Sequence, residues 1–178
     1  MNTYIFTSER LGFRNWKADD VDLLFKLNSN QEVMRYFPSA HTKEQCAEFI
    51  GRMQNQFEKN KFCYFAVDLL ETEEFIGFIG ISEQTYEIDF NPSVDIGWRV
   101  LPKYWGKGYA TEGARACLHY GFETIQLEKI VSVAPSINIP SITVMKKIGM
   151  EKVKSFNHPL LTDFPKIEEC VLFEITKN

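Results

Sequence analysis

The sequence predicts a single α+β domain that spans residues 1–178. Its length is that of one ordinary globular domain, which buries enough surface to need no disulfide or metal. Some segments carry apolar residues at helical spacing, and others are the short β-branched and aromatic runs typical of strands. The chain has no internal repeat, low-complexity tract or linker at which a second domain would begin.

The first third of the chain is expected to form one strand and two helices. Residues 4–14 alternate loosely and are rich in aromatics, which favours a strand. An apolar stripe over residues 21–27 predicts a helix that ends at 28–30. Thr42 and Gln45 stand at the two positions of a capping box, and the apolar stripe after them predicts the second helix.

After residue 60 the period changes from helix to strand. The runs 62–70 and 75–81 are apolar, β-branched and aromatic, and the polar segment 71–74 joins them. This pattern predicts an antiparallel pair that is covered on both faces. The later elements are expected as a strand at 93–101, a glycine-bearing loop at 102–108, a helix at 109–124, a strand at 129–134, a helix at 140–148 that stops at Gly149, and a last strand at 168–176.

The composition excludes several classes of protein. With 44% apolar and 25% charged residues, the chain is predicted to be soluble and folded. No stretch approaches the roughly 20 apolar residues of a membrane-spanning helix. The start at Met1 has neither the basic head nor the apolar core of a signal peptide, so a cytoplasmic location is expected. The net charge of −4 argues against nucleic-acid binding, because phosphates require a basic face.

The cysteines give no sign of a metal site or a disulfide. Cys46, Cys63, Cys117 and Cys170 are scattered, lie in apolar runs and never reach C-x-x-C spacing. They are therefore expected to be reduced residues of the core.

Two adjoining segments carry opposite charge. Between Asp68 and Asp95 there are eight carboxylates and no Lys or Arg, whereas residues 96–111 hold three cations and no acid. Most charge runs are solvated surface. The pattern also suits a cationic and an anionic ligand that meet at one strand, so an acidic surface that attracts amines is expected.

The segment 94–112 carries the strongest functional pattern. A strand is followed by a loop with Gly106 and Gly108 and then by the start of a helix. Such an arrangement gathers backbone N–H groups around a pyrophosphate, and Lys107 adds positive charge.

Two familiar phosphate loops are excluded. A Walker loop needs Gly-Lys at its end, and here Gly108 is followed by Tyr109. A dinucleotide loop needs a third small residue where Thr111 stands and an acid after the next strand, whereas Glu128 precedes that strand.

The loop Lys103-Tyr104-Trp105-Gly106-Lys107-Gly108 resembles the Q/R-x-x-G-x-G/A motif of the GNAT superfamily of acetyltransferases, with Lys in the first position. Its flanks, 96–98 and 109–113, are similar to the RimJ/RimL-type branch. A second match lies downstream, where Asn138-Ile139-Pro140-Ser141 and residues 144–150 resemble the N-x-x-S and x-K-x-G motifs of that branch. The resemblance extends to 156–159 and 170–173 and so covers essentially the whole chain.

The resemblance implies a GNAT-like fold, in which a mixed, twisted central sheet splays at the acetyl-CoA site and carries helices on both faces. Strand backbone would hold the pantetheine of acetyl-CoA, and loop N–H groups would hold the pyrophosphate. Because no acid is near them in the sequence, Arg99 and Lys103 are expected to face phosphates. The residues implied for acetyl-CoA binding are Trp98, Arg99, Val100, Lys103, Trp105, Gly106, Lys107, Gly108, Tyr109, Ala110, Asn138 and Ser141.

Transfer of an acetyl group to an amine calls for a base that keeps the amine neutral. Asp95 is the first candidate, since it stands where the branch usually has Glu; it would otherwise be a solvated strand residue. Glu83 and Glu87 are the alternatives. His158 is a further candidate, although a lone His-Pro in a loop is more often structural.

The departing thiolate needs an acid. Many relatives carry a Tyr seven residues after the motif Asn, but here that position is Met145. Ser141 is then the best proton donor to the CoA sulfur, and Asn138 would bond the pantetheine. Both residues also suit the first turn of a helix, with Asn138 as the N-cap.

Tyr36, Phe37, Glu83 and Tyr86 are expected to line the acceptor pocket. The predicted function is a cytoplasmic N-acetyltransferase that moves an acetyl group from acetyl-CoA to a primary amine by direct attack, the acceptor being a protein N-terminus or a small amine. The alternative is a catalytically silent module that binds acyl-CoA. No metal, nucleic acid or membrane is expected as a partner, and the chain is expected to be a monomer or a homodimer.

Overall fold

The computed structural model describes residues 3–177, which build one mixed eight-stranded sheet. The strands lie in the order β1-β2-β3-β4-β5-β6-β8-β7. Neighbouring strands are antiparallel throughout, except that β5 and β6 are parallel. The strands are β1 (Phe6–Thr7), β2 (Leu11–Arg14), β3 (Tyr64–Leu69), β4 (Phe75–Gln84), β5 (Ser93–Val100), β6 (Lys129–Pro135), β7 (Glu151–Asn157) and β8 (Glu169–Thr176).

The described helices connect and cover these strands. They are α1 (Val21–Asn28), α2 (Gln31–Met34), α3 (Lys43–Asn60), α4 (Tyr109–His119) and α5 (Ile139–Lys147). Short 3₁₀ turns precede α1 and α4, and a π-helical turn at Tyr120–Thr124 extends α4. Within residues 3–177, none of the helices is long and apolar enough to cross a membrane.

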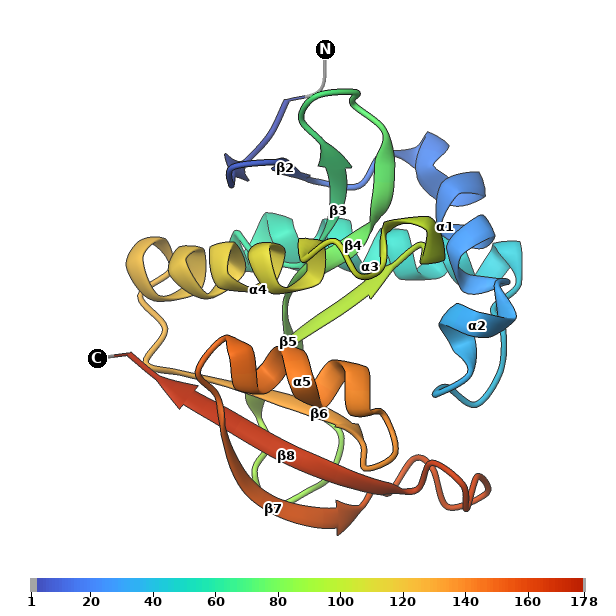
Figure 1. The fold of residues 1–178 in the computed structure, drawn as a ribbon, viewed down its shortest axis with the longest axis vertical. Helices are drawn as coiled ribbons and strands as arrows, with labels where there is room; N and C mark the ends of the chain where they lie inside the picture. Colours follow the sequence, from blue (N-terminus) through green and yellow to red (C-terminus); the bar gives the residue numbers. More distant parts are fainter. Residues whose placement is uncertain (1–2, 178) are drawn as a thin grey trace.

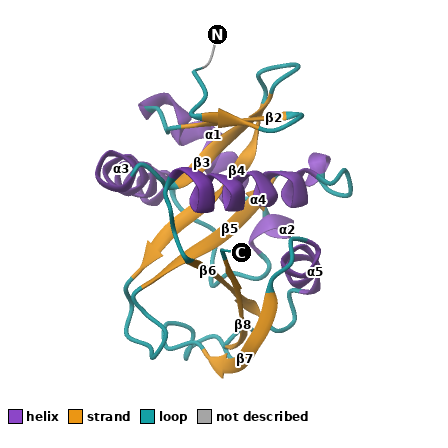
Figure 2. Ribbon diagram, turned by 90° about the vertical axis from the view of Figure 1, so that its left-hand side faces the viewer, coloured by secondary structure: helices purple, strands orange, loops and turns teal. Residues whose placement is uncertain are grey.

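Helices cover both faces of the sheet (Figure 2). On one face, the Ser82 hydroxyl of β4 donates to Gln56 of α3 (2.9 Å). On the other, α4 lies so close that a Cβ at Gly113 would be 2.4 Å from the side chain of Ile79 on β4. Successive residues of a strand point to opposite faces, so the two helical layers receive alternate residues of β4 and β5.

β5 and β6 pair at a single register position, where Asp95 lies opposite Val131. β4 and β5, by contrast, are paired at every position from Ser93 to Val100. Figure 1 shows β5 and β6 diverging, with α4 on one side of the opening and α5 on the other. The sheet is therefore splayed along the second half of β5, as the family resemblance implied.

Most predicted elements are confirmed. The capping box is present, because Thr42 accepts from the Gln45 N–H (3.2 Å) and the Gln45 side chain accepts from the Thr42 N–H (2.9 Å). The predicted elements at 62–70, 93–101, 129–134, 140–148 and 168–176 match β3, β5, β6, α5 and β8 to within two residues.

Three elements differ from the prediction. The expected first strand is broken by a polar turn, in which the Ser8 N–H donates to the Leu11 carbonyl (2.9 Å), and it becomes the hairpin of β1 and β2. The four-residue helix α2 follows an N-cap at Asn30 and was too short for an apolar stripe to indicate it. β7 is an edge strand with mostly exposed side chains, so its sequence carries little apolar alternation.

A buried ion cluster joins the first strands to the helical layer. The guanidinium of Arg14, on β2, donates to Asp68 on β3 (2.7 Å) and to Asp20 in the turn before α1 (2.7 Å). All three side chains are almost fully buried. The cluster therefore positions the start of α1, and the last residue of α1, Asn28, accepts a hydrogen bond from Arg99 of the site described below.

Replacing Asp68 with Ala is expected to lower the free energy of unfolding by about 3–5 kcal/mol, because Arg14 would be left buried beside one carboxylate. Denaturant unfolding measures the change. The matched control is Asp22→Ala, which breaks the exposed ion pair between Asp22 and Lys43 and is expected to cost much less. Equal losses in the two variants would contradict the assigned role of the cluster.

Candidate functional site

Two hollows adjoin at the splay between β5 and β6. One, here the loop hollow, has a volume of about 830 Å³ and is lined by residues of the Gly106–Gly108 loop, the start of α4 and one face of α5. The other, here the aromatic hollow, has a volume of about 440 Å³ and lies over β4, β5 and β6. Six residues line both hollows: Tyr36, Phe37, Trp98, Arg99, Asn138 and Ser141.

The loop hollow presents the N-terminus of α4. Gly106 and Gly108 adopt φ angles of 71° and 80°, a left-handed region that favours glycine. A Cβ at Gly106 would meet no atom within 4 Å, so the loop backbone is open to a ligand there. Within residues 3–177, no side chain caps α4. The free N–H groups and the helix dipole make this end of α4 suitable for an anion.

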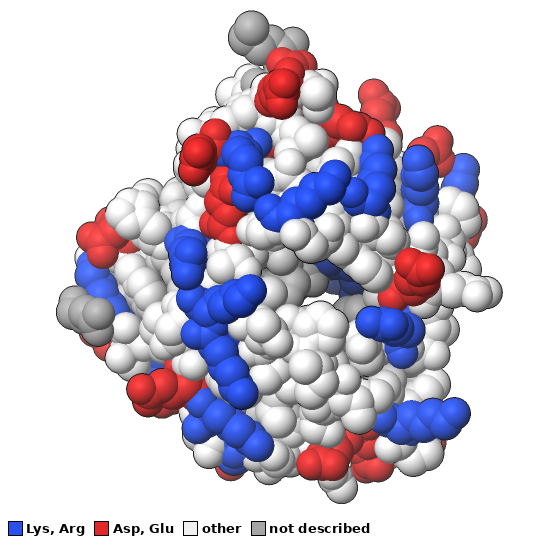
Figure 3. Space-filling view, in the orientation of Figure 1, with Lys and Arg blue, Asp and Glu red and all other residues white. Residues whose placement is uncertain are grey.

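Cations surround the loop hollow, although not those expected from the sequence. Lys103 is exposed and paired with Glu74, and neither Lys103 nor Lys107 lines the hollow. Arg35, after α2, and Lys147, at the end of α5, do line it. Figure 3 shows Lys and Arg side chains on both sides of the hollow region at the centre of this face.

The backbone of β5 faces the splay at alternate residues. The Leu101 N–H, just after β5, donates to the carbonyl of Ile76 on β4 (2.9 Å). Backbone groups alternate in direction along a strand, so those of Arg99 also point to β4, whereas those of Trp98 and Val100 point to the opening. The Val100 carbonyl accepts from the Trp105 indole (2.7 Å). Within the chain, the groups best placed to pair with an extended ligand are therefore those of Trp98 and the Val100 N–H.

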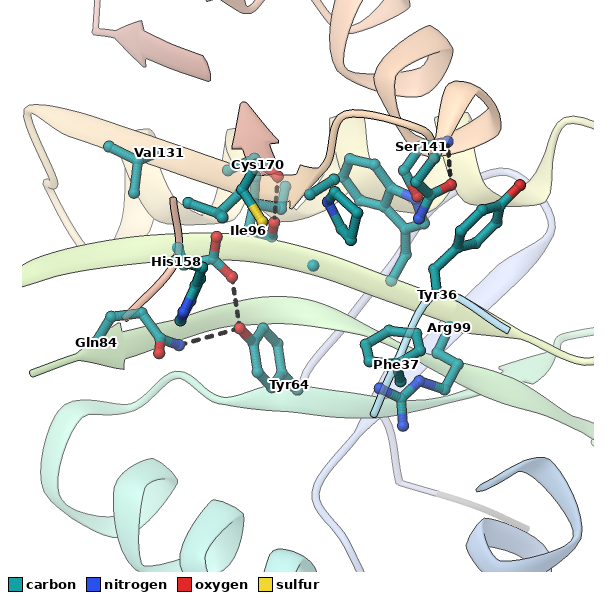
Figure 4. A pocket seen from close by; sticks show the side chains of 18 of the residues that line it. Tyr36, Phe37, Tyr64, Gln84, Ile96, Arg99, Val131, Ser141, His158 and Cys170 are labelled. Atoms are coloured by element: carbon teal, nitrogen blue, oxygen red, sulfur yellow. Dashed lines mark hydrogen bonds between the residues drawn. The ribbon is translucent and has the colours of Figure 1, made fainter. Parts of the chain in front are cut away.

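The first turn of α5 closes the far side of the splay. The Asn138 side chain caps α5 by accepting from the Ser141 N–H (3.2 Å), which leaves its amide N–H groups for another partner. Ser141 lines both hollows, and its hydroxyl makes no hydrogen bond within residues 3–177. Met145 is buried and lines the aromatic hollow. Figure 4 shows Ser141 and Tyr36 on the same side of this space.

The aromatic hollow is mostly apolar. Histidines aside, two of its described lining residues are acidic or basic. These two are Asp95 and Arg99, and both lie on the face of β5 that α1 and α3 cover. The walls include eight aromatic rings, those of Tyr36, Phe37, Phe49, Tyr64, Phe78, Tyr86, Phe90 and Trp98.

Asp95 is a partly buried carboxyl group at the junction of β5 and β6. The Tyr64 hydroxyl donates to its Oδ2 (2.5 Å), and Gln84 donates to the Tyr64 oxygen (3.2 Å), as the dashed lines in Figure 4 show. Burial raises the pKa of Asp95 to about 7, and the hydrogen bonds from Tyr64 and the Val133 backbone offset only part of that effect. Asp95 can therefore exchange a proton near neutral pH.

A family model described as an acetyltransferase (GNAT) domain matches residues 10–151. The chain belongs to the GNAT acetyltransferase family. It is 34% identical over 151 residues to an uncharacterised N-acetyltransferase of Bacillus subtilis, YnaD, with 82% of each chain covered. A GNAT-family acetyltransferase structure from Bacillus anthracis matches with a TM-score of 0.80 at 28% identity over 96% of both chains. The fold is also similar to that of a ribosomal-protein-S5-alanine acetyltransferase from Vibrio fischeri, with a TM-score of 0.79, 18% identity, and 97% and 96% of the two chains covered.

This GNAT protein is an acetyl-CoA-dependent acetyltransferase, and the residues of the loop hollow fit its acyl donor. The uncapped start of α4 and the two left-handed glycines suit a pyrophosphate. The open backbone edge of β5 suits the amides of pantetheine. Ten of the twelve residues implied for donor binding line this hollow, and the two that do not are Lys103 and Lys107.

Of the other residues predicted as a base, the two glutamates lie outside the two hollows and His158 lies in one of them. Glu83 and Glu87 are exposed and line neither hollow. The alternation of β4 turns Gln84 inward in place of Glu83, and Glu87 lies beyond the end of β4. His158 lines the aromatic hollow, stacks on Tyr86 (4.7 Å between ring centroids) and accepts from the Leu160 N–H (3.2 Å).

The acidic segment 68–95 does not form the expected uncompensated surface. Asp68 is fully buried against Arg14. Glu74, Glu83 and Asp89 lie beside cations from distant parts of the chain, namely Lys103, Lys59 and Lys154. The segment contains no Lys or Arg, but the fold brings lysines from other segments next to three of its acids.

Three residues of the site were not predicted. Tyr64 contacts Asp95 only through the pairing of β3, β4 and β5, so no local signal marks it. Arg35 follows a helix that was not expected. Lys147 is the Lys of the downstream x-K-x-G motif. Helical spacing places it on the same face of α5 as Thr143 and Val144, so its position in the hollow could have been predicted from the sequence.

Replacing Gly108 with Val is expected to abolish the rise in melting temperature that acetyl-CoA produces, because a side chain at φ 80° strains and fills the loop. Thermal unfolding with and without acetyl-CoA measures the shift. The control is Gly149→Val, which introduces similar strain at φ 90° after α5, outside both hollows. Gly149→Val should lower the melting temperature yet keep the shift; a shift retained in Gly108→Val would remove the loop from the donor site.

Proposed function

We propose that this acetyltransferase is a cytoplasmic N-acetyltransferase of the RimJ/RimL type that acetylates a primary amine by direct attack. The observation that carries the proposal is the meeting of the two hollows at the splay. A phosphate-binding loop opens into one hollow, a carboxyl group titrating near neutral pH lies in the other, and Ser141 borders both. The fold of the ribosomal-protein-S5-alanine acetyltransferase supports the assignment to this branch.

The donor is acetyl-CoA, which supplies the acetyl group as a thioester. We assign its pyrophosphate to the N–H groups between Gly106 and Ala110, with charge from Arg35 and Lys147. The pantetheine would follow the open edge of β5 at Trp98 and Val100. Trp105 contributes indirectly, because its indole holds the Val100 carbonyl and thereby shapes the loop.

Asp95 acts as the base in this proposal, directly or through a water molecule. In its ionised form it accepts the proton that the amine loses, and Tyr64 keeps the carboxylate oriented. No thiol of the described chain takes part, because the four cysteines are buried and burial raises the pKa of each of them. The amine therefore attacks the thioester itself.

Ser141 is the proposed acid for the departing thiolate. Met145 occupies the position at which the family resemblance implies a Tyr, and a thioether donates no proton. The Ser141 hydroxyl borders both hollows and is free of other described partners. Asn138 holds the turn that presents it and offers its amide N–H groups to the pantetheine.

Ser141→Ala is expected to lower kcat by about 10²-fold while leaving the affinity for acetyl-CoA near the wild-type value, as for a contact made in the transition state. Steady-state release of the CoA thiol and a binding titration measure the two quantities. Ser141→Thr keeps a hydroxyl group and should recover part of the rate. A fall in affinity with intact turnover at saturation would reassign Ser141 to donor binding.

Asp95→Asn is expected to remove a pH-dependent part of the rate. Asp95 becomes a base as pH rises through about 7, so the ratio of wild-type to variant kcat/KM should rise through that range and then level off. Using one amine for both proteins cancels the titration of the amine. Asp89→Asn removes an exposed carboxylate outside both hollows and should give a constant ratio; the same constancy for Asp95→Asn would exclude Asp95 as the base.

The second candidate function is a silent acyl-CoA-binding module, which the loss of the motif Tyr at Met145 favours. Release of the CoA thiol over a panel of primary amines and N-terminal peptides separates the two functions. The proposed enzyme releases thiol with at least one acceptor, whereas the silent module gains thermal stability from acetyl-CoA and releases none.

A further inference from the structure

We propose that Arg99 forms a carboxylate-binding subsite in the aromatic hollow, so that the acceptor is an amine that also carries a carboxylate on an apolar body, as an apolar amino acid does. This inference rests on the proposed function for the identity of the acceptor. The subsite itself rests on the geometry of Arg99 and is testable by binding alone.

Arg99 faces away from the donor loop. Its Nη1 donates to the Asn28 side chain at the end of α1 (2.7 Å), and its guanidinium lies 3.9 Å from the centre of the Phe37 ring and 5.1 Å from that of Phe78. Figure 4 shows Arg99 beside Phe37 and away from Ser141. The side chain is thus held on the α1 and α3 side of β5, although Arg99 also lines the loop hollow.

The positive charge of Arg99 has no counter-ion within residues 3–177. None of the described ion pairs includes it, and its Nε is buried with no hydrogen-bond partner. Burial lowers the pKa of Arg99 to about 10, which still leaves it charged at neutral pH. Leaving this charge without a counter-ion in an apolar wall is costly, and a carboxylate bound at the guanidinium would compensate it.

Neutral neighbours hold the guanidinium in place without cancelling its charge. The Asn28 amide that accepts from Arg99 also contacts His41 (3.3 Å), and burial lowers the pKa of His41 and thereby favours its uncharged form. The fold therefore orients the cation and leaves its charge available. An Arg in an apolar, partly enclosed wall is well suited to a carboxylate, because it combines charge with directed N–H groups.

Asp95 and Arg99 lie on one face of β5, four residues apart, which is about 13 Å along a strand. Gly97 lies between them and has no side chain, and the Tyr64 ring would be 3.2 Å from a Cβ there. The wall between the two charged residues is therefore flat and aromatic. An acceptor with an anionic group toward Arg99, an amine toward the splay and an apolar body against the rings fits this arrangement.

The same features disfavour a polycation as the acceptor. Asp95 is the one carboxylate among the described residues that line the aromatic hollow, and the acids of segment 68–95 are otherwise exposed or paired outside it. A chain of ammonium groups would face Arg99 with no compensating acids. This inference differs from the expectation, drawn from charge along the sequence, of an acidic surface that attracts amines.

The experiment compares phenylalanine and leucine with their amides, since each pair shares the amine and the apolar body and differs only in the carboxylate. For the wild-type enzyme, kcat/KM with acetyl-CoA should be at least about tenfold higher for the acids. Arg99→Met should abolish that preference and leave the affinity for acetyl-CoA unchanged. The control is Arg52→Met, which removes an exposed Arg of α3 outside both hollows and should keep the preference.

A binding arm separates failure of this inference from failure of the proposed function. Calorimetry on CoA-loaded wild-type protein should show tighter binding of the acids than of the amides, whether or not any amine is acetylated. Equal wild-type binding of acids and amides overturns the subsite even if Arg99→Met does not fold. A variant that retains the preference for the acids overturns it too, and so does one that loses only acetyl-CoA affinity, which would assign Arg99 to the donor.

Discussion

The parallel junction of β5 and β6, closed at Asp95 and Val131 alone, is the constraint on which the whole site depends. Hydrogen bonding of β5 to β4 keeps one edge of β5 straight, while the departure of β6 leaves its other edge unpaired. An unpaired strand edge offers donors and acceptors to an extended ligand. The splay thus joins the loop hollow to the aromatic hollow, and Ser141 lines both of them.

Arg14, which is buried, and Arg99, which is partly buried, differ in whether a counter-ion accompanies them. Arg14 is neutralised by Asp20 and Asp68, so its charge is used within the protein and ties β2 and β3 to the turn before α1. Arg99 is also held in a fixed orientation, by Asn28 and two Phe rings, yet no carboxylate of residues 3–177 forms an ion pair with it. An arginine therefore stabilises the fold where carboxylates pair with it, as at Arg14. Where no carboxylate of residues 3–177 pairs with it, as at Arg99, its charge is available to a ligand.

Local motifs were predictable because neighbouring residues determine them. The loop glycines and the Asn138 cap act through their own backbone conformation and the next helical turn, and both appear where the sequence indicates. The roles of Arg99 and Glu83 were not predictable in this way. Strand alternation places each on a particular face, but what covers that face is decided by helices far away in the chain.

The sequence by itself determined the α+β class, the order of most elements and the two-glycine loop before α4. These follow from periodicity, capping and turn preferences over a few residues. Only the tertiary structure decided that Tyr64 meets Asp95, that distant lysines neutralise much of the acidic segment and that Arg99 remains unpaired. The physical reason is that burial and Coulomb interactions depend on distance in space, and sheet pairing brings together charges that the sequence keeps dozens of residues apart.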